Sequence, residues 1–310
     1  MIPLNPHNTA PQDFDTELFT TLLYPCPDWW LDVHCRRLLQ HVKTLAPNLS
    51  LDNNVEVSTL RTDVKQSLES LSSDCLPTVV RLEAGLCKTR PEAGTASAAF
   101  SLQLRPVPHA LKAAVLCLTP YEKPSPHLKI KTLNSYNILA ETVSVRDAIQ
   151  RQGYQKDGYP DALWSNSQGL ITETTTANFF IFRNTDDDRI QILTPPTSLC
   201  LAGTVRSWLL NVLEALNAEA PHIDVHETPL TWETLSHDHQ AFSGAFLTNA
   251  VHGIIPVLSI FNPDANIPEA KQSLSFSQDA FCKIHHRLRH HWRSAGLRFA
   301  VDYSQENAAK

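Results

Sequence analysis

The chain has 310 residues, of which 42% are hydrophobic and 19% charged, and its formal net charge at pH 7 is −6. Such a composition is typical of a soluble globular protein, and the length allows two domains around a large buried core. The negative charge and the lack of basic runs disfavour a nucleic-acid surface, and the longest apolar runs are too short to span a bilayer.

The cysteines and the N-terminal residues indicate where the protein works. Seven cysteines occur without close Cys-x-x-Cys pairs, which disfavours a disulfide framework or a zinc ribbon and favours small buried thiols in a reducing compartment. Residues 1–13 lack the basic and apolar regions of a signal peptide, and they do not form the Arg- and Ser-rich opening of a transit peptide. We therefore expect a cytoplasmic protein.

The first part of the chain predicts a small domain of strands and helices. The patterns predict a strand at 14–23, helices at 29–45 and 60–71, and strands at 78–86, 98–104 and 113–118. A Pro-rich segment, residues 119–126, follows and is typical of an interdomain connection. We therefore expect a small N-terminal α/β domain over residues 1–122 and a large C-terminal domain over residues 123–310.

The second part of the chain predicts a larger sheet with flanking helices. The predicted elements are helices at 134–152, after Gly203 and at 277–295, a hairpin of strands 161–165 and 170–174 around Gly169, and strands at 179–183, 190–193 and 241–248. The last helix carries Cys282, His286 and His290 four residues apart, a spacing that metal ligands can use. Surface histidines on an Arg-rich helix explain them more simply, so no metal site is predicted.

A lysine and a glutamate lie at the ends of two predicted strands. Lys131 follows a short apolar–polar alternation at 127–130, and Glu173 follows the turn at 166–169. An amine and a carboxylate that face one cavity suit a cofactor with an aldehyde at one end of a pyridine ring and the ring nitrogen at the other. The lysine forms a Schiff base with the aldehyde, and the carboxylate keeps the ring nitrogen protonated. Taken alone, the pair is equally well explained by surface charges.

The whole pattern, from about Phe14 to about Val257, resembles the fold-type IV pyridoxal-phosphate enzymes. These include branched-chain and D-amino-acid aminotransferases and aminodeoxychorismate lyase. The resemblance implies an α+β fold of two domains with pyridoxal 5'-phosphate bound between them, a small-molecule substrate and Lys131 as the catalytic lysine. It also implies a homodimer with sites near the subunit interface, and the C-terminal helix is extra to the pattern.

Other cofactor residues follow from the resemblance, residue by residue. The segment His34 to Leu38 resembles a His-x-x-Arg-Leu motif whose arginine, here Arg37, binds the cofactor phosphate through its planar guanidinium. Tyr136, five residues after the lysine, is implied to bond the ring oxygen of the cofactor. Glu173 and Asn178 match a Glu-x-x-x-x-Asn pattern.

A phosphate site is predicted at the start of one helix. The segment 201–206 resembles a Leu-x-Gly-Ile-Thr-Arg element, and it places Gly203 and Thr204 at a predicted helix N-terminus. Free backbone N–H groups and the helix dipole favour a phosphate there. Val205 stands where the family has a threonine, so the backbone amide can donate but one hydroxyl contact is in doubt.

Residues for the far side of the site are less defined. Thr248 and Asn249 resemble the last site loop of the family, which implies that Thr248 contacts the cofactor and Asn249 the substrate. Arg90, Arg105 and His252 are candidates for binding the substrate carboxylates, because all three are expected on loops. The Tyr-x-Arg-Pro segment of the branched-chain enzymes is not evident, and residues 104–106, Leu-Arg-Pro, match it only in part.

The segment Phe19-Thr20-Thr21 resembles the Phe-Thr-Thr of aminodeoxychorismate lyases, where aminotransferases of the family carry Phe-Glu-Gly or Phe-Glu-Thr. The resemblance implies that Thr21 assists proton transfer near Lys131. The implied reaction converts 4-amino-4-deoxychorismate to 4-aminobenzoate and pyruvate, a step of folate precursor synthesis. It implies aminodeoxychorismate synthase as a functional partner, which supplies the substrate.

Two other functions stay open at this point. An aminotransferase acting on a D- or branched-chain amino acid would use the same lysine and cofactor, and would return a proton to the cofactor carbon instead of eliminating. A catalytically silent subunit kept for binding is the second alternative. The intact set of Lys131, Glu173 and Arg37 disfavours it, whereas the Val205 departure leaves it possible.

Overall fold

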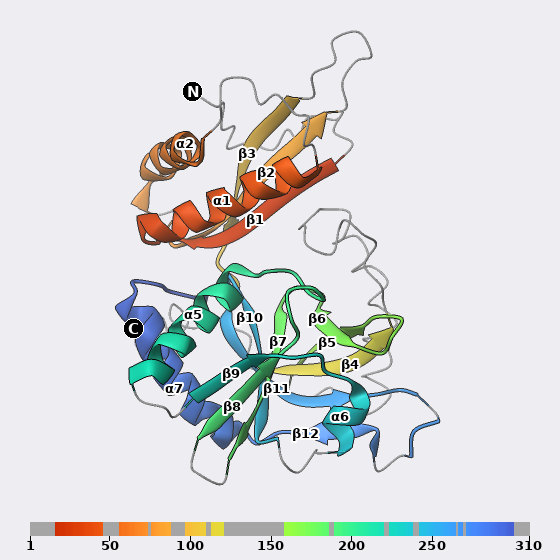
Figure 1. Ribbon diagram of the computed structural model, residues 1–310. Helices are drawn as coiled ribbons and strands as arrows, with labels where there is room; N and C mark the ends of the chain where they lie inside the picture. Colours follow the sequence, from red (N-terminus) through yellow and green to blue (C-terminus); the bar gives the residue numbers. More distant parts are fainter. Residues whose placement is uncertain are drawn as a thin grey trace.

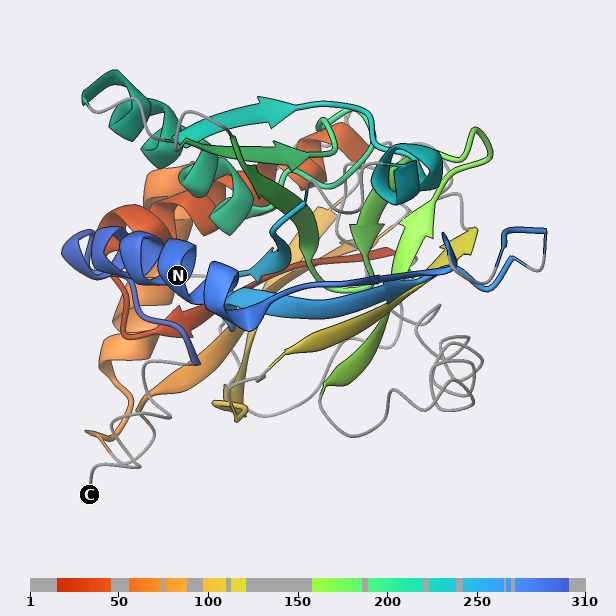
Figure 2. The ribbon, with the colours of Figure 1, turned by 90° about the horizontal axis from the view of Figure 1, so that it is seen from below.

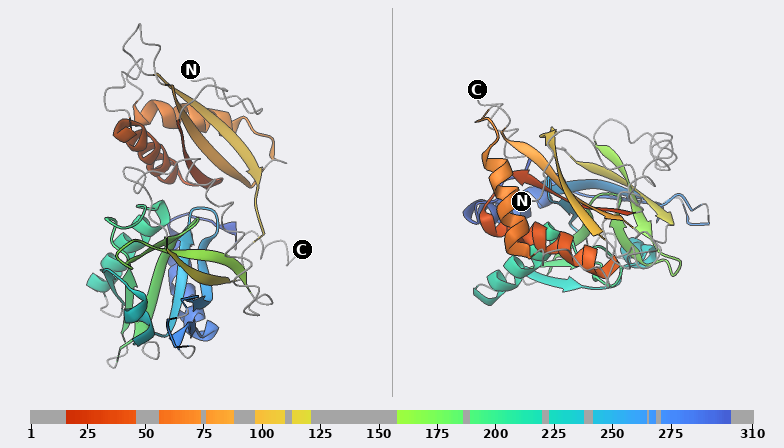
Figure 3. Two further views of the ribbon diagram at one scale, coloured as in Figure 1. Left: turned by 90° about the vertical axis from the view of Figure 1, so that its right-hand side faces the viewer. Right: turned by 90° about the horizontal axis from the view of Figure 1, so that it is seen from above.

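The structure, a computed structural model, describes residues 16–45, 56–73, 76–87, 97–109, 113–120, 158–185, 189–219, 223–237, 242–264, 266–268 and 271–300. Over these ranges the chain forms a three-stranded sheet and a nine-stranded sheet, which Figures 1 and 3 show stacked one above the other. Within them, no helix combines the length and the apolar character that crossing a membrane requires. We name residues 16–106 the first unit and residues 114–300 the second unit.

The first unit is an antiparallel sheet covered by two helices on one face. Its elements are β1 (Thr16–Tyr24), α1 (Asp28–Leu45), α2 (Val57–Glu69), β2 (Thr78–Cys87) and β3 (Ser97–Pro106), with strand order β1-β2-β3. Side chains alternate between the faces of a strand, so Leu18, Leu22, Val80 and Leu82 form one apolar face, and α1 and α2 cover it. The opposite face of the same strands is mixed, with polar side chains such as Arg81 beside the buried Phe19 and Val79.

The second unit is a mixed sheet with helices on both faces. Its strands are β4 (Ala114–Pro120), β5 (Tyr159–Ser165), β6 (Ile171–Thr174), β7 (Asn178–Asn184), β8 (Ile190–Thr194), β9 (Ile223–Glu227), β10 (Gly244–Asn249), β11 (Gly253–Phe261) and β12 (Ser273–Ser275). Its helices are α5 (Thr204–Glu219), α6 (Trp232–His237) and α7 (Gln278–Ser294). The strand order is β6-β5-β4-β11-β10-β7-β8-β9, and β12 pairs with β11.

Strand β7 shows why the second unit needs helices on both sides. Phe180 and Phe182 point into the cluster that includes residues of α5 and α7, whereas Phe179 and Ile181 point into the cluster that includes residues of α6. All four side chains are buried. A strand that is apolar on both faces is stable only between two covering layers. Figure 2 shows α1, α2, α5 and α7 gathered on one side of the molecule.

One expectation about the domains is wrong. The strand at 113–118 was expected in the small N-terminal domain, but β4 pairs in parallel with β5 and β11 of the large sheet. Its alternate residues enter two different apolar clusters, as expected for a central parallel strand. The chain therefore passes from the first sheet to the second between Pro106 and Ala114, before the expected boundary at residue 122.

Most other predicted elements are confirmed. The hairpin of β5 and β6 turns at Gly169, whose φ of 74° suits a glycine. Strands β9 and β12 and the short helix α6 were not predicted, and β11 was not predicted as a strand because the segment from Gly253 was assigned to a loop of the site. The predicted strand at 127–130 and helix at 134–152 lie outside the described residues.

The two units share one apolar core. Trp30, near the start of α1, is 2% exposed and packs in the cluster formed by Phe180, Phe246, Trp292 and other residues of the second unit. Helix α1 and strand β1 lie on the side of the first unit nearest to the second, with α5 beneath them in Figure 1. The contact therefore brings the Phe-Thr-Thr strand and Arg37 to the side on which α5 lies.

Candidate active site

Glu173 is a buried carboxylate with a fixed orientation. It lies on β6 and is 4% exposed. Its Oε2 accepts hydrogen bonds from Nδ2 of Asn178 at 3.3 Å and from the backbone N–H of Leu201 at 3.2 Å. Nδ2 of Asn178 also donates to the carbonyl of Leu201 at 2.8 Å. The predicted Glu-x-x-x-x-Asn pair is thus a hydrogen-bonded unit, tied to the loop that precedes α5.

Gly203 is the residue that lets this loop approach Asn178. A Cβ atom at position 203 would collide with Oδ1 of Asn178. The first helical hydrogen bond of α5 runs from the N–H of Ser207 to the carbonyl of Gly203, at 2.8 Å. The amides of the first turn of a helix have no acceptor within the helix, and they carry the positive end of its dipole. The start of α5 therefore offers N–H donors beside Glu173 and Asn178.

Thr204 and Thr248 add two hydroxyls that lack a hydrogen-bond partner among the described residues. Thr204 is the first residue of α5 and is 5% exposed, and Thr248, on β10, is 2% exposed. Thr248 lies directly opposite Asn178 in the pairing of β10 with β7, so both side chains are on one face of the sheet. A buried hydroxyl without a partner is costly. We call Glu173, Asn178, Gly203, Thr204 and Thr248 the helix-start cluster.

Val205 takes no part through its side chain. It is buried in the apolar cluster with Leu209 and Leu213, on the core side of α5. A threonine there would place its hydroxyl against apolar side chains. Only the backbone amide of Val205 is left to contact a ligand at the start of α5.

Arg37 is held by the first threonine of the Phe-Thr-Thr strand. Nη2 of Arg37 donates to Oγ1 of Thr20 at 2.6 Å, and the same oxygen lies 2.6 Å from Nδ1 of His34. Thr20 and His34 are fully buried, and Arg37 is half-buried. The His-x-x-Arg motif and the threonine strand therefore act together, because His34 and Thr20 orient Arg37.

Thr21 points the other way, onto the polar face of the first sheet. It is half-buried and lies opposite Arg81 in the pairing of β1 with β2. Nε of Arg81 is 2.8 Å from Oε1 of Glu83, and the guanidinium carbon lies 4.1 Å from the ring centre of Phe19. Glu83 also accepts hydrogen bonds from Gln103 at 3.0 Å and Ser101 at 3.2 Å. We call Thr21, Arg81, Glu83, Ser101 and Gln103 the polar face.

Arg81 is a candidate site residue that the sequence analysis missed. It is 8% exposed, although most charged side chains stay in water. The alternation Val80-Arg81-Leu82-Glu83 was a visible signal, since it places the two charged residues on the face of the strand opposite to the two apolar ones. Its proximity to Thr21 became visible only through the strand pairing.

Three of the remaining predicted residues, Lys131, Tyr136 and Arg90, lie outside the described residues. Arg105 was expected on a loop but is an exposed residue of β3, and its Nη2 donates to Oε1 of Gln103, a member of the polar face, at 3.1 Å. Oδ1 of Asn249 accepts the backbone N–H groups of the turn that follows it, so this oxygen shapes the turn.

Two titratable groups, one buried and one partly buried, lie beside elements of the helix-start cluster: Asp161 on β5, which pairs with β6, and His252 in the turn after β10. Burial raises the pKa of Asp161, on β5, to about 6, against hydrogen bonds from Thr175 and the amide of Ala162 that lower it. Burial lowers the pKa of His252, in the turn after β10, to about 4. Nδ1 of His252 has no hydrogen-bond partner among the described residues. Asp161 therefore stays protonated up to a higher pH than an exposed aspartate does, and His252 is neutral at pH 7.

No group of three or more His, Cys, Asp or Glu side chains that could hold a metal ion occurs among the described residues. Cys282, His286 and His290 are exposed on α7.

Comparison with known proteins identifies the family of this arrangement. The sequence model described as amino-transferase class IV matches residues 17–260. No curated protein matches the sequence.

Solved structures of this family share the fold. An aminotransferase from Brucella abortus bound to pyridoxal phosphate is 19% identical, with a TM-score of 0.62, and the match covers 89% of this chain and 88% of that one. A 4-amino-4-deoxychorismate lyase from Pseudomonas aeruginosa is 18% identical, with a TM-score of 0.61 and coverages of 93% and 96%. The branched-chain aminotransferase of Escherichia coli is 16% identical, with a TM-score of 0.60 and coverages of 87% and 83%. The fold class implied by the sequence is confirmed.

Proposed function

Because the chain belongs to the class IV aminotransferase family, we propose that it is a pyridoxal-phosphate-dependent 4-amino-4-deoxychorismate lyase. The reaction gives 4-aminobenzoate and pyruvate. The family is one of pyridoxal-phosphate enzymes, and pyridoxal 5'-phosphate is the cofactor of this chain. The likeness to solved lyases and aminotransferases supports the fold alone, so the choice between the reactions rests on the residues.

The helix-start cluster fits the cofactor. The unpartnered hydroxyls of Thr204 and Thr248 and the first-turn amides of α5 are suited to the oxygens of a phosphate. Glu173 is suited to a protonated pyridine nitrogen, because a buried carboxylate oriented by two donors is a strong acceptor. Arg37, oriented by Thr20, is proposed to add its charge to the phosphate, and Lys131 to bond the aldehyde.

The choice of a lyase rests on one observation: the two threonines of β1 lie on opposite faces of the strand and have different hydrogen-bond partners. Thr20 holds Arg37 and His34, so its hydroxyl is occupied. Thr21 faces the opposite side, half-buried, and its hydroxyl makes no hydrogen bond to the described residues. A hydroxyl in that position can exchange a proton with a substrate. Aminotransferases of the family that carry Phe-Glu-Gly have no such hydroxyl at the second position. Those that carry Phe-Glu-Thr keep it and differ at the first position, where Thr20 holds Arg37 in this chain.

The proposed chemistry needs one proton removed and one returned. When bound, pyridoxal phosphate supplies an electron sink beside the substrate carbon that bears nitrogen. Lys131 takes the proton from that carbon, the bond from the neighbouring carbon to the enolpyruvyl oxygen breaks, and the ring becomes aromatic. Thr21 or the protonated Lys131 returns a proton to the leaving group, which is released as pyruvate.

A class IV aminotransferase is the second candidate, and Arg81 is the observation that favours it. Its guanidinium on the polar face can pair with a carboxylate of an amino-acid substrate if Glu83 gives way. The branched-chain enzymes also share the fold. An aminotransferase needs a second substrate that accepts the amino group, whereas the lyase needs none.

The proposed function implies a pathway, a partner enzyme, an oligomeric state and a compartment. A lyase of this kind works in folate precursor synthesis and depends on aminodeoxychorismate synthase, which makes its substrate from chorismate and glutamine. We propose a homodimer in the cytoplasm, as for the family that the sequence resembles. The shared core around Trp30 indicates that one chain already brings its two units together.

Purified protein, chorismate, glutamine and aminodeoxychorismate synthase test the proposal. We expect 4-aminobenzoate and pyruvate in equal amounts without any added keto acid, and neither product with Lys131→Ala. A yellow protein that forms no 4-aminobenzoate would exclude the lyase. Amino acids would then be screened against 2-oxoglutarate and pyruvate, and transfer of an amino group would establish the aminotransferase.

A further inference from the structure

The segment after α7 reaches the turn that follows Thr248. The family match ends at residue 260, so this segment, residues 295–300, lies beyond it. The N–H of Ala300 donates to the carbonyl of Val251 at 2.8 Å. The ring of Phe299 lies against Gly253, where an added Cβ would be 2.6 Å from the ring. Both contacts fall on the turn between β10 and β11.

This turn is short and is held from two sides. On its own side, Oδ1 of Asn249 accepts the N–H groups of Val251 at 3.1 Å and His252 at 2.7 Å. Gly253 has a φ of 76°, which favours glycine, and its missing side chain leaves the space that Phe299 fills. Residues 295–300, which we call the tail, therefore contact the turn from the outside, while the side chain of Asn249 holds it by hydrogen bonds from within.

The tail itself is firmly anchored. Phe299 is 1% exposed and its ring meets the ring of Trp292 edge to face, with centroids 5.4 Å apart. The N–H of Leu297 donates to the carbonyl of Trp292 at 2.8 Å. The same apolar cluster contains Trp30 of the first unit. Movement of the tail is therefore coupled to the core that joins the two units.

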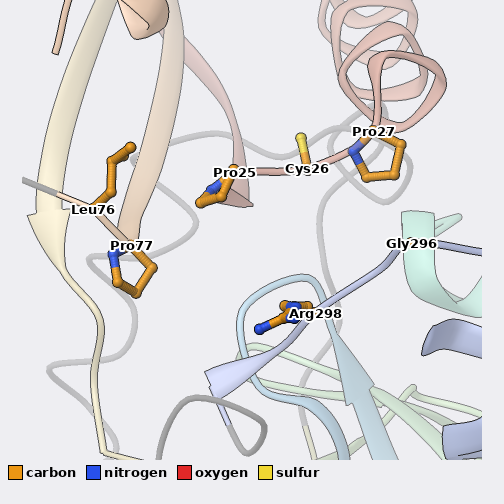
Figure 4. Close-up of a pocket in the computed structure, with 7 residues that line it drawn as sticks. All are labelled: Pro25, Cys26, Pro27, Leu76, Pro77, Gly296 and Arg298. Carbon is orange, nitrogen blue, oxygen red and sulfur yellow. The ribbon is translucent and has the colours of Figure 1, made fainter. Parts of the chain in front are cut away.

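The outer side of the tail faces the first unit. Gly296 lies against Pro27, since an added Cβ would be 3.0 Å from the Pro27 ring. Arg298 faces the loop segments of the first unit across a crevice of about 400 Å³, which is lined by Pro25, Cys26, Pro27, Leu76, Pro77, Gly296 and Arg298 (Figure 4). The tail thus lies between the start of α1 and the turn after Thr248.

We propose that Phe299 is a positioning residue, which holds the Asn249–Gly253 turn so that Thr248 keeps the geometry that binds the cofactor. The inference rests on the proposed role of Thr248 in the helix-start cluster. Shortening Phe299 to Ala removes the ring that covers Gly253 and loosens the bond of Ala300 to Val251. The turn gains conformational freedom, and the hydroxyl of Thr248 loses its fixed direction.

The test compares cofactor affinity in variants of the apo protein. Phe299→Ala is paired with Leu288→Ala, which removes a side chain of α7 from the same apolar cluster. Pyridoxal phosphate is titrated into each apo protein and followed by absorbance, and thermal unfolding of the apo proteins is measured in parallel. Hydrogen exchange reports the amides of Val251, His252 and Gly253.

We expect both variants to lose thermal stability, but only Phe299→Ala to weaken cofactor affinity, by about 10- to 100-fold, the range seen when groups that orient a ligand-binding residue are removed. Its turn amides should exchange faster, and Phe299→Leu should restore most of the affinity. Equal affinity losses in Phe299→Ala and Leu288→Ala would overturn the proposal, as would unchanged affinity in Phe299→Ala. If Phe299→Ala does not fold, Gly253→Ala replaces it, because its added Cβ collides with the Phe299 ring. We expect this variant to weaken cofactor affinity, and unchanged affinity in it would overturn the proposal.

Failure of this inference is distinguishable from failure of the proposed function. The titration reads cofactor affinity and does not depend on which reaction the protein catalyses. A wild-type protein that binds pyridoxal phosphate without forming 4-aminobenzoate contradicts the lyase and leaves the role of Phe299 intact. A wild-type protein that does not bind pyridoxal phosphate contradicts both.

Discussion

The helix-start cluster and the polar face are both buried and polar, but they differ in how their groups are satisfied. In the helix-start cluster, the hydroxyls of Thr204 and Thr248 have no hydrogen-bond partner among the described residues. On the polar face, Arg81 and Glu83 pair with each other, and Gln103 and Ser101 complete Glu83. We therefore propose that a ligand completes the first group, whereas a ligand at the second must compete with an existing ion pair.

This difference suggests separate tasks for the two units. The second unit offers unfilled donors at a helix start and suits an anion, so we propose that it supplies most of the cofactor site, to which Arg37 of the first unit adds its charge. The first unit offers Thr21 beside a locked charge pair, so we propose that this face acts on the substrate. The predictions below either break this separation or make it sharper, and they run from the largest expected effect to the smallest.

Gly203→Ala should break the helix-start cluster. The added Cβ collides with Oδ1 of Asn178, so Asn178 must move, and its bonds to Glu173 and Leu201 are lost with it. We expect the affinity for pyridoxal phosphate to fall by about 1,000-fold, or about 4 kcal/mol. Gly169→Ala is the control for a glycine replacement without a collision, because no atom lies within 4 Å of its Cβ position although its φ is positive. It should cost about 1 kcal/mol of stability and leave cofactor affinity unchanged.

Asp161 and His252 should give opposite pH dependences of stability. The folded pKa of Asp161, about 6, is above its usual value, so its stabilising effect is complete below pH 4 and is lost as the pH rises through 6. The folded pKa of His252, about 4, is below its usual value, so its stabilising effect is complete above pH 6.5 and is lost as the pH falls through 4. Each effect is worth up to about 3 kcal/mol.

Urea unfolding between pH 4 and pH 7 separates these effects. Asp161→Asn, which leaves His252 acting alone, should gain stability as the pH rises. His252→Gln, which leaves Asp161 acting alone, should lose stability over the same interval. Parallel curves for the two variants would contradict both assignments.

Glu83→Gln should disturb the polar face without touching the cofactor. The change leaves the buried guanidinium of Arg81 beside a neutral amide, and we expect a loss of about 2 kcal/mol in unfolding free energy. Cofactor affinity should not change. Glu69→Gln, which removes an exposed partner 3.8 Å from Lys65, is the control and should cost less than about 0.5 kcal/mol. A weaker cofactor affinity in Glu83→Gln would show that the two regions are not separate.

Thr204→Val should raise the unfolding free energy of the apo protein and weaken its affinity for pyridoxal phosphate. It replaces a buried hydroxyl that lacks a partner among the described residues, so we expect a gain of about 1 kcal/mol in the apo state and about a tenfold loss in cofactor affinity. Thr194→Val is the matched control, because its hydroxyl donates to the carbonyl of Phe179 at 2.8 Å. That variant should lose about 1 kcal/mol. A destabilised Thr204→Val apo protein would show that its hydroxyl is already satisfied.

Local patterns predicted much of the fold and part of the site. Helices α1, α5 and α7 have apolar residues at helical spacing, and the turn at Gly169 was visible as a Gly-containing break between two strands. The position of Gly203 before α5 was implied by the motif. These features depend on residues close together in the chain.

Features that depend on distant pairing could not be predicted. The apolar run of β4 fits either sheet, and only its pairing with β5 and β11 assigns it. The sequence shows two equivalent threonines at 20 and 21, and strand alternation relative to α1 makes them different. The contact of Phe299 with Gly253 joins residues 46 positions apart, and no local sequence pattern predicts it.

The most direct test of the separation compares Thr248→Val with Thr21→Val in one experiment, by measuring cofactor affinity and the rate of 4-aminobenzoate formation at saturating pyridoxal phosphate. We expect Thr248→Val to weaken cofactor affinity about tenfold with little change in the saturated rate. We expect Thr21→Val to keep the affinity and to slow the reaction by about 100-fold, the lower end of the range for general acid–base catalysis. Loss of cofactor affinity in Thr21→Val, or an unchanged rate, would contradict the account.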